Sequence, residues 1–149
     1  MIIVVTGTPG TGKTTYAKAF AAKHGYAYVN DNALIKKYNL SEGYDKIDQC
    51  EIVDTDKFNA KLVELISAAR KARKSIVIDS HLGHFLPPRY VDTCIVMRCS
   101  NLKELKKRLA ARKYSVQKIK DNLEAEIMES CVQDAIAKGH TVEVVETGK

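Results

Sequence analysis

Apolar residues in this chain fall into short continuous runs, separated by longer stretches in which they recur every three or four positions. The short runs are rich in β-branched residues, which favour strands. They predict five strands, at Ile2 to Thr6, Ala27 to Val29, Ser75 to Asp79, Thr93 to Cys99 and Thr141 to Glu146. Strands without polar alternation are typical of a parallel sheet that is covered on both faces.

The stretches between these runs predict helices. Helices are expected at about Lys13 to His24, from Asn30 or Asp31 through Lys37, from about Asp56 to Arg73, after Asn101, and from Ser115 to Gly139. The segment from Asn39 to Asp56 is rich in acids and shows no clear periodicity, so we expect an irregular arm there. The alternation of strands and helices predicts a single α/β domain over residues 1–149, with a mainly parallel sheet.

Composition then narrows the class of protein. The chain has 149 residues, of which 45% are hydrophobic and 28% charged, which is ordinary for one globular domain and excludes a disordered or fibrous protein. Its longest apolar run, Ile2 to Val5, is too short to cross a membrane and lacks the features of a signal peptide. The four cysteines form no C-x-x-C pair, so we expect free thiols, no structural metal, and a location in the cytoplasm, or in the nucleus only in a eukaryote.

Basic residues concentrate in one part of the chain. The net charge is +6, and the segment from Arg98 to Lys120 holds nine lysines and arginines against the single acid Glu104. Each of these side chains, taken singly, is most simply explained as part of a solvated helix face. As a block, the bias favours a partner that carries phosphate groups.

The turn after the first predicted strand reads GTPGTGKTT. Gly7, Gly12, Lys13 and Thr14 match the phosphate-binding pattern G-x-x-x-x-G-K-[ST], and the match lies between a predicted strand and a predicted helix, as this loop requires. Glycines allow successive backbone N–H groups to wrap a phosphate. We therefore expect ATP here, with Lys13 at its β- and γ-phosphates and the Thr14 hydroxyl on Mg²⁺.

The stretch SIVIDSHLGHFLPPR ends a predicted buried strand in an acid, followed two residues later by a histidine. A P-loop enzyme needs a second acid, at the carboxyl end of a strand beside the loop, to hold the metal or its water. Asp79 fits that place, although an aspartate that caps the next turn is an alternative. For His81 two roles stay open: the ring orients a water or contacts substrate, or it satisfies a backbone group.

A third set of candidates lies in RLAARKYSVQK. Arg108 and Arg112 are four residues apart on a predicted helix, so both can reach one cluster of phosphates. Arginines that close over a transferred phosphoryl group stabilise its charge and exclude water. The alternative for each arginine is a solvated surface position.

Together these segments resemble a known family, the P-loop adenylate kinases called adenylate kinase isoenzyme six, or CINAP, and their archaeal homologues. The resemblance covers nearly the whole chain. It rests on GTPGTGKTT, on EGYD and the acids to Asp56, on DSHLGHFLPPR, and on Arg108, Arg112, Tyr114, Lys118, Asn122 and Glu126. Its most specific part is the D-x-H at Asp79 to His81.

The resemblance implies the fold of a nucleoside monophosphate kinase, with a parallel sheet of strand order 2-3-1-4-5. It also implies a short lid over about residues 111–121 and a monophosphate-binding arm over about residues 30–53. The implied ATP site consists of Gly7, Gly10, Gly12, Lys13, Thr14, Thr15 and Arg112. The implied monophosphate contacts are Asn30, Lys36 and Arg89.

Relatives often have glycine at the position of Lys113 and arginine at that of Lys36, so lid flexibility and monophosphate affinity are expected to differ here.

The leading hypothesis is phosphoryl transfer from ATP to AMP or another nucleoside monophosphate. The candidate catalytic residues are Lys13, Asp79, His81, Arg108 and Arg112. The resemblance further implies some ATPase activity and a role in maturation of the small ribosomal subunit, through ribosomal protein uS11 and close to pre-rRNA. One alternative is an assembly ATPase with little metabolic role, and another is a small-metabolite kinase that uses the same loop.

Overall fold

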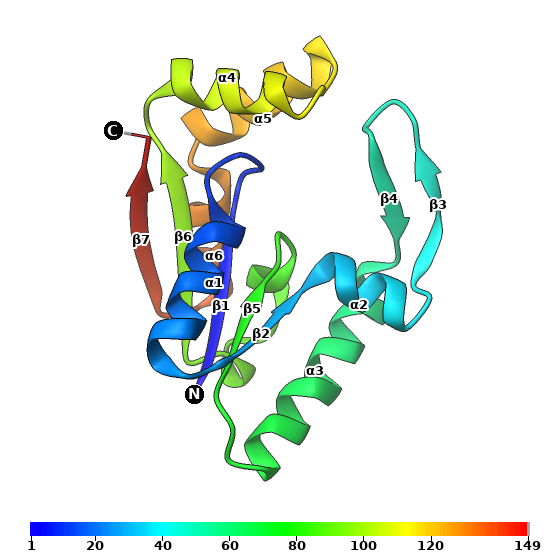
Figure 1. Cartoon of the computed structure of the whole chain (residues 1–149), viewed down its shortest axis with the longest axis vertical. Helices are drawn as coiled ribbons and strands as arrows, with labels where there is room; N and C mark the ends of the chain where they lie inside the picture. Colours follow the sequence, from blue (N-terminus) through cyan, green and yellow to red (C-terminus); the bar gives the residue numbers. More distant parts are fainter. Residues whose placement is uncertain (149) are drawn as a thin grey trace.

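The computed structural model describes residues 1–148 of the chain. At its centre is a five-stranded parallel sheet, made of β1 (Ile2–Gly7), β2 (Ala27–Asn30), β5 (Ile76–Asp79), β6 (Thr93–Cys99) and β7 (Val142–Thr147). The strands lie in the order β2-β5-β1-β6-β7 (Figure 1). Counted among themselves along the chain, they have the expected order 2-3-1-4-5, and the labels differ because a separate hairpin contributes β3 and β4.

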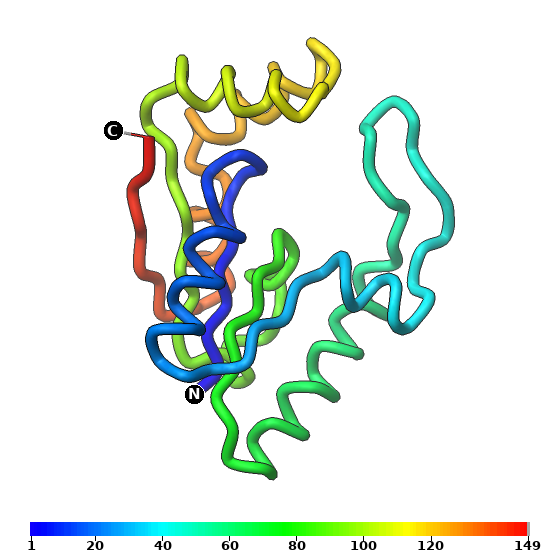
Figure 2. The backbone as a smooth tube through the Cα atoms, viewed as in Figure 1, coloured from blue at the N-terminus to red at the C-terminus, as the bar shows by residue number. Residues whose placement is uncertain are grey.

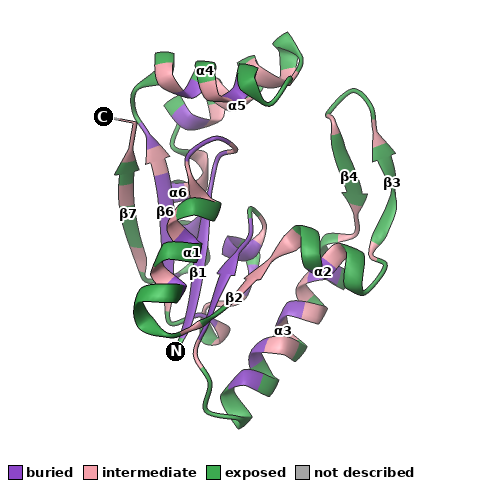
Figure 3. Ribbon diagram, in the orientation of Figure 1, coloured by how far each residue is buried: buried purple, intermediate pink, exposed green. Residues whose placement is uncertain are grey.

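Alternate residues of β1 contribute to two halves of the core. Ile2 and Val4 pack with α3 (Thr55–Lys71) and α6 (Ser130–Lys138) on one face of the sheet. Ile3 and Val5 pack with α1 (Lys13–His24) on the other face. The strands β1 and β5 are therefore buried on both faces (Figure 3), and the carboxyl ends of all five strands meet at one edge of the sheet.

The arm is an ordered insertion between β2 and α3. It consists of α2 (Asp31–Lys37) and an antiparallel hairpin of β3 (Ser41–Asp45) and β4 (Cys50–Val53). The hairpin stands apart from the sheet, and most of its residues are exposed (Figure 3). The expectation of irregular structure here was wrong, because a ribbon exposed on both faces has no apolar face that would produce a periodic pattern.

The helix expected from Ser115 to Gly139 is in fact two helices. α5 (Val116–Ile127) ends before Met128, and α6 begins after Glu129, whose φ of 54° is left-handed. Arg98 stabilises this break: its Nη2 donates to the carbonyl oxygen of Glu126 at 3.1 Å, and its guanidinium pairs with the Glu129 carboxylate. A helix usually ends at a glycine or is followed by a proline, but here the break is stabilised by Arg98, which is distant in the sequence. The local sequence therefore carries no signal for the break.

Helix α4 (Leu102–Ala111) packs against the loop between β1 and α1 and leads into the segment expected to form the lid, over about residues 111–121. It buries Leu105 and Leu109 in a small core with Cys99. In the turn that follows, Lys113 has a φ of 59°. This left-handed conformation costs a non-glycine residue about 1 kcal/mol, whereas the glycine that the resemblance implies would adopt it freely.

Helices α3, α4, α5 and α6 are amphipathic rather than apolar on all sides. The 17-residue α3, for example, buries Phe58, Leu62 and Ile66 and exposes charged residues on its other side. Among residues 1–148, no helix has both the length and the apolar character needed to cross a membrane.

Candidate active site

The loop between β1 and α1 has the conformation of a phosphate cradle. Gly7, Gly10 and Gly12 have φ of 147°, 86° and 91°, values that side chains disfavour. A Cβ atom at Gly7 would lie 2.7 Å from the carbonyl oxygen of Met97, and one at Gly10 would lie 3.1 Å from the Leu105 side chain. The loop leads into the N-terminus of α1, where free N–H groups attract anions. The conformation and the close packing both require glycine.

Lys13 begins α1, and its side chain folds back over this loop. Its Nζ donates to the carbonyl oxygen of Gly7 at 3.2 Å. Burial lowers the pKa of Lys13, while the carboxylates of Asp79 and Asp31 act in the opposite direction. A phosphate bound in the loop would add to the effect of these carboxylates and favour the charged lysine.

Asp79 ends β5 beside the first turn of α1. Its Oδ2 accepts hydrogen bonds from the hydroxyls of Thr14 and Tyr28, each at 2.7 Å, and the residue is only 3% exposed. A buried carboxylate next to a hydroxyl fits Mg²⁺, which prefers oxygen ligands and takes few from the protein at phosphate sites. Thr14 and Asp79 would hold this ion, directly or through water. Once bound, it would supply positive charge to the phosphates.

His81 contacts the base of the arm. Its Nδ1 lies 2.7 Å from Oδ2 of Asp31, and its backbone N–H donates to the same oxygen at 3.3 Å. Burial alone would raise the pKa of Asp31, but the hydrogen bond and charge of His81 outweigh it, so this pKa lies below its ordinary value. The imidazole therefore bonds an ionised carboxylate and not a backbone group.

The candidate arginines Arg108, in α4, and Arg112, at the start of the expected lid, differ in their surroundings. Arg108 lies against the P-loop, where its Nη1 donates to the carbonyl oxygen of Gly10 at 3.1 Å and its Nε pairs with Glu104 at 3.3 Å. Arg112 is exposed and contacts the Tyr114 hydroxyl at 3.4 Å. Both arginines line a hollow of about 690 Å³, together with Gly12, Thr15 and Thr147. The hollow has room for a nucleoside whose phosphates lie in the loop.

The tip of the hairpin meets the lid. The Gln49 side chain donates to the carbonyl oxygen of Lys113 at 3.1 Å and accepts from the backbone N–H of Ser115 at 2.6 Å. Lys118 donates to the carbonyl oxygens of Asp48 and Gln49. Figure 2 shows the hairpin tip directed toward the turn between α4 and α5. The side chains of Gln49 and Lys118 make the hydrogen bonds between the two segments. We call these contacts the Gln49 clasp, and they connect the arm with the lid.

Comparisons with known proteins agree with this geometry. Residues 3–129 match the family model described as "AAA domain". The "Putative adenylate kinase" of Thermococcus kodakarensis is 40% identical over 151 residues, which cover 100% of this chain and 78% of the relative. The "Adenylate kinase isoenzyme 6 homolog FAP7" of Saccharomyces cerevisiae is 39% identical over 135 residues, which cover 90% of this chain and 66% of the relative. The chain belongs to the adenylate kinase isoenzyme 6 family.

Membership of the adenylate kinase isoenzyme 6 family makes the chain a P-loop phosphotransferase. The fold itself is shared more widely. The unliganded structure of a sugar kinase from Janibacter sp. has a TM-score of 0.58 and 21% identity, and the match covers 97% of this chain and 84% of that one. At this identity the likeness shows the fold alone.

Not all the expected monophosphate contacts lie together. Asn30 is at the base of the arm, where its Oδ1 caps α2 by accepting from Ala33 at 2.8 Å. Lys36, where the resemblance to the adenylate kinase isoenzyme 6 family implies arginine, is exposed in the last turn of α2. Arg89 lies in a short 3-10 turn (Pro88–Tyr90) just before β6, at the amino ends of the strands, and its carbonyl accepts from Arg70. The structure does not bring Arg89 to the site, because the P-loop is at the carboxyl ends.

Sequence reasoning missed Tyr28, Asp31 and Gln49. Tyr28 and Asp31 lie at the carboxyl end of β2, where Asn30 is paired with Asp79 in the neighbouring strand. The predicted strand order already made these ends neighbours, so a signal for the first two residues was available. No local pattern indicated Gln49, because its contacts depend on how far the arm reaches toward the lid.

A buried carboxylate lies beneath the P-loop. Glu126 accepts from the backbone N–H of Cys99 at 2.7 Å, and its other oxygen lies 3.4 Å from the Thr8 hydroxyl and 3.3 Å from Arg98 Nε. Burial raises the pKa of Glu126, whereas Cys99 N–H and Arg98 act in the opposite direction. Glu126 thus connects α5 with the P-loop and with the end of β6.

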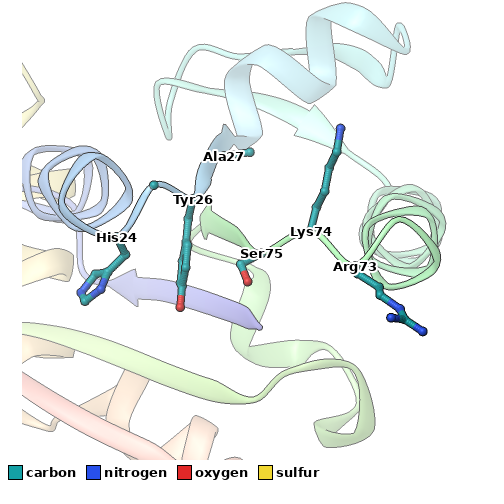
Figure 4. A pocket seen from close by; sticks show the side chains of 7 residues that line it. His24, Tyr26, Ala27, Arg73, Lys74 and Ser75 are labelled. Carbon is teal, nitrogen blue, oxygen red and sulfur yellow. The ribbon is translucent and has the colours of Figure 1, made fainter.

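A second hollow, of about 400 Å³, lies at the far end of the sheet (Figure 4). Its lining includes His24, Tyr26, Arg73 and Lys74. The helices α1 and α3 end here, so the basic side chains complement the negative ends of two helix dipoles. None of the candidate site residues lines this hollow.

Proposed function

We propose that this chain transfers the terminal phosphoryl group of ATP to AMP and so produces two molecules of ADP. The observation that carries the proposal is the convergence of Lys13, Thr14 and Asp79 at the carboxyl edge of the sheet, between a hairpin arm and the segment that bears Arg108 and Arg112. The names of the relatives support a nucleoside monophosphate as the acceptor and AMP in particular.

Each part of the site has a role in this reaction. The loop N–H groups and Lys13 would hold the phosphates of ATP, and Arg108 and Arg112 would stabilise the charge of the transferred group. The phosphate of AMP is already a nucleophile, so it needs alignment rather than removal of a proton. The arm, through Asn30 and Lys36, would hold this acceptor. The Gln49 clasp, which joins arm to lid, would limit the entry of water.

The substitution Lys13→Ala tests the proposal. Loss of the ammonium should lower the rate of ADP formation from ATP and AMP by about 100-fold or more, with the fold intact by circular dichroism. Lys23→Ala, an exposed substitution in the same helix, is the matched control and should leave the rate unchanged. Unchanged turnover in Lys13→Ala would rule out this site.

We further propose ATP hydrolysis as a second activity, and a role in maturation of the small ribosomal subunit with uS11 as partner. The resemblance supports this role, and the exposed lysines 103, 106 and 107 of α4 would suit nearby rRNA. The four free cysteines suit a reducing compartment such as the cytoplasm.

Turnover of ATP and Mg²⁺ with AMP, CMP, GMP, UMP and dAMP, with and without uS11, separates the functions. Weak transfer with uS11-responsive hydrolysis would indicate an assembly ATPase, and phosphorylation of a small metabolite instead would indicate another kinase class.

A further inference from the structure

Two hydroxyl groups share one oxygen of the Asp79 carboxylate. Oδ2 of Asp79 accepts from Thr14, in the first turn of α1, and from Tyr28, in β2, each at 2.7 Å. Each oxygen of an ionised carboxylate offers about two lone-pair directions, so these two donors fill those of Oδ2. Within residues 1–148, the hydrogen bonds of this carboxylate all reach Oδ2. Oδ1 is therefore the oxygen that is left for another ligand.

Asn30 determines where the Tyr28 hydroxyl sends its proton. Oδ1 of Asn30 accepts from the backbone N–H of Ala33 at 2.8 Å, which leaves the amide nitrogen of Asn30 free to donate elsewhere. This nitrogen donates to the Tyr28 oxygen at 3.4 Å. A phenol has a single proton, and because Asn30 already donates to its oxygen, that proton goes to Asp79. The base of the arm thus orients the hydroxyl that holds Oδ2.

The number of oxygens that Asp79 can offer affects which cation suits the site. Ca²⁺ takes about six to eight oxygen ligands and can bind both oxygens of one carboxylate, whereas Mg²⁺ demands a smaller octahedral shell and keeps several of its waters. A carboxylate with the lone pairs of one oxygen already occupied cannot bind an ion through both oxygens. Asp79, held in this way, suits Mg²⁺ or one of its waters better than it suits Ca²⁺.

We propose that Tyr28 is a positioning residue that gives the site a preference for Mg²⁺ over Ca²⁺, because its hydroxyl occupies Oδ2 and leaves Asp79 with one open oxygen. This inference rests on the part of the proposed function that brings ATP and its metal ion to the P-loop. Tyr28 acts through Asp79 and is not itself a ligand. Without the Tyr28 hydroxyl, Oδ2 regains a free lone pair, and the carboxylate can bind a larger ion through both oxygens.

Binding of a non-hydrolysable ATP analogue tests the inference without turnover. Isothermal titration calorimetry of the full chain with AMPPNP gives a dissociation constant in excess Mg²⁺, in excess Ca²⁺ and in EDTA. The wild type should bind most tightly with Mg²⁺. Tyr28→Phe should reduce the preference for Mg²⁺ over Ca²⁺ by about 10-fold, with unchanged binding in EDTA. Tyr26→Phe is the matched control, since Tyr26 lines the second hollow at the far end of the sheet, and it should keep the wild-type preference.

Each contrary outcome has its own meaning. An unchanged preference in Tyr28→Phe would overturn the inference. Equal losses of affinity in Mg²⁺, Ca²⁺ and EDTA would also overturn it, because they would show that the hydroxyl only supports the local fold. A wild type that binds AMPPNP equally well in Mg²⁺ and in EDTA would refute it as well, since Asp79 would then hold no ion. Failure of the proposed function is distinguishable: a wild type that prefers Mg²⁺ but transfers phosphate to no acceptor contradicts the transfer reaction alone.

Discussion

Glu126 shows how much a single buried charge contributes at the site. The residue is 2% exposed, yet it has polar partners in the P-loop, at the end of β6 and in the Arg98 guanidinium. Its removal would leave Arg98 with Glu129 as its remaining carboxylate partner and the Cys99 N–H without an acceptor. Loss of partners is more costly for buried polar groups than for exposed ones, because water cannot replace them.

Glu126→Ala should therefore lower the free energy of unfolding by about 3 kcal/mol. Glu126→Gln keeps an oxygen for the Cys99 N–H and should lose clearly less. Urea denaturation measures both variants, and Glu124→Ala, an exposed position on the same helix, is the control. A loss in Glu126→Ala no larger than that of the control would show that these contacts contribute nothing net.

At the scale of single residues, site residues that belong to a short sequence pattern could be predicted. The position in space of a residue far along the chain could not. The P-loop and Asp79 were identifiable because a glycine pattern and an acid at a strand end lie within short segments. Arg89 follows the same strand in sequence, but the chain returns to the amino ends of the strands before reaching it. A resemblance could not reveal this displacement, since it aligns residues and not their positions in space.

Among the elements, the arm and the lid depend on each other. The hairpin has few buried residues of its own, and its tip is held by side chains that reach backbone groups of the lid. Each such hydrogen bond contributes about 1 kcal/mol. The Gln49 clasp is therefore strong enough to favour the position of the arm against the lid, and weak enough for the two to separate during turnover. We therefore expect the joint movement of the two elements to depend on Gln49.

Gln49→Ala should raise the KM for AMP several-fold and increase the share of ATP that is hydrolysed, because an open arm holds the acceptor less well and admits water. Stability should change little, since the residue is far from the core. Steady-state assays that count ADP and inorganic phosphate measure both effects. Gln133→Ala on α6 provides the control. An unchanged KM together with an unchanged share of hydrolysis would mean that the clasp does not act during turnover.

Across the elements, sequence periodicity predicted the helices that have an apolar face and failed for the hairpin and for the break between α5 and α6. The helices α3 and α4 have an apolar face that the pattern indicates, and the buried strands form continuous apolar runs. The hairpin lacks such a face, and the break between α5 and α6 depends on Arg98, which comes from β6. Contacts made across the fold leave no local pattern.

For the whole molecule, His84 connects stability with pH. The side chain is 3% exposed, its Nδ1 lies 3.0 Å from the Thr6 hydroxyl of β1, and its Nε2 lies 3.9 Å from Asp134 of α6. Burial lowers the pKa of His84 to about 4, with Asp134 acting in the opposite direction. The folded protein therefore keeps this ring neutral at a pH where the unfolded chain would bind a proton.

The sign of the pH dependence follows. Well above pH 6.5 the His84 ring is neutral in both states. As the pH falls through 6.5, the ring gains a proton in the unfolded chain but stays neutral in the folded protein until about pH 4, so the unfolded state is favoured. Between pH 7 and pH 5 this difference should lower the free energy of unfolding by about 2 kcal/mol. His84→Gln should show a flatter dependence, while His24→Gln, an exposed control, should follow the wild type. Urea titrations at both pH values measure the slopes, and parallel curves for His84→Gln and the wild type would contradict the prediction.

The Gln49 clasp has one more consequence, for the cooperativity of binding. In the proposed reaction the arm would cover the acceptor and the lid would cover the donor, and the Gln49 clasp joins these two segments. A ligand that favours the closed position of one segment therefore favours closure of the other. By thermodynamic linkage, ATP should tighten the binding of AMP by the same factor by which AMP tightens the binding of ATP. A hairpin that contributes little to the core would thus make the two proposed substrate sites behave as a single cooperative unit.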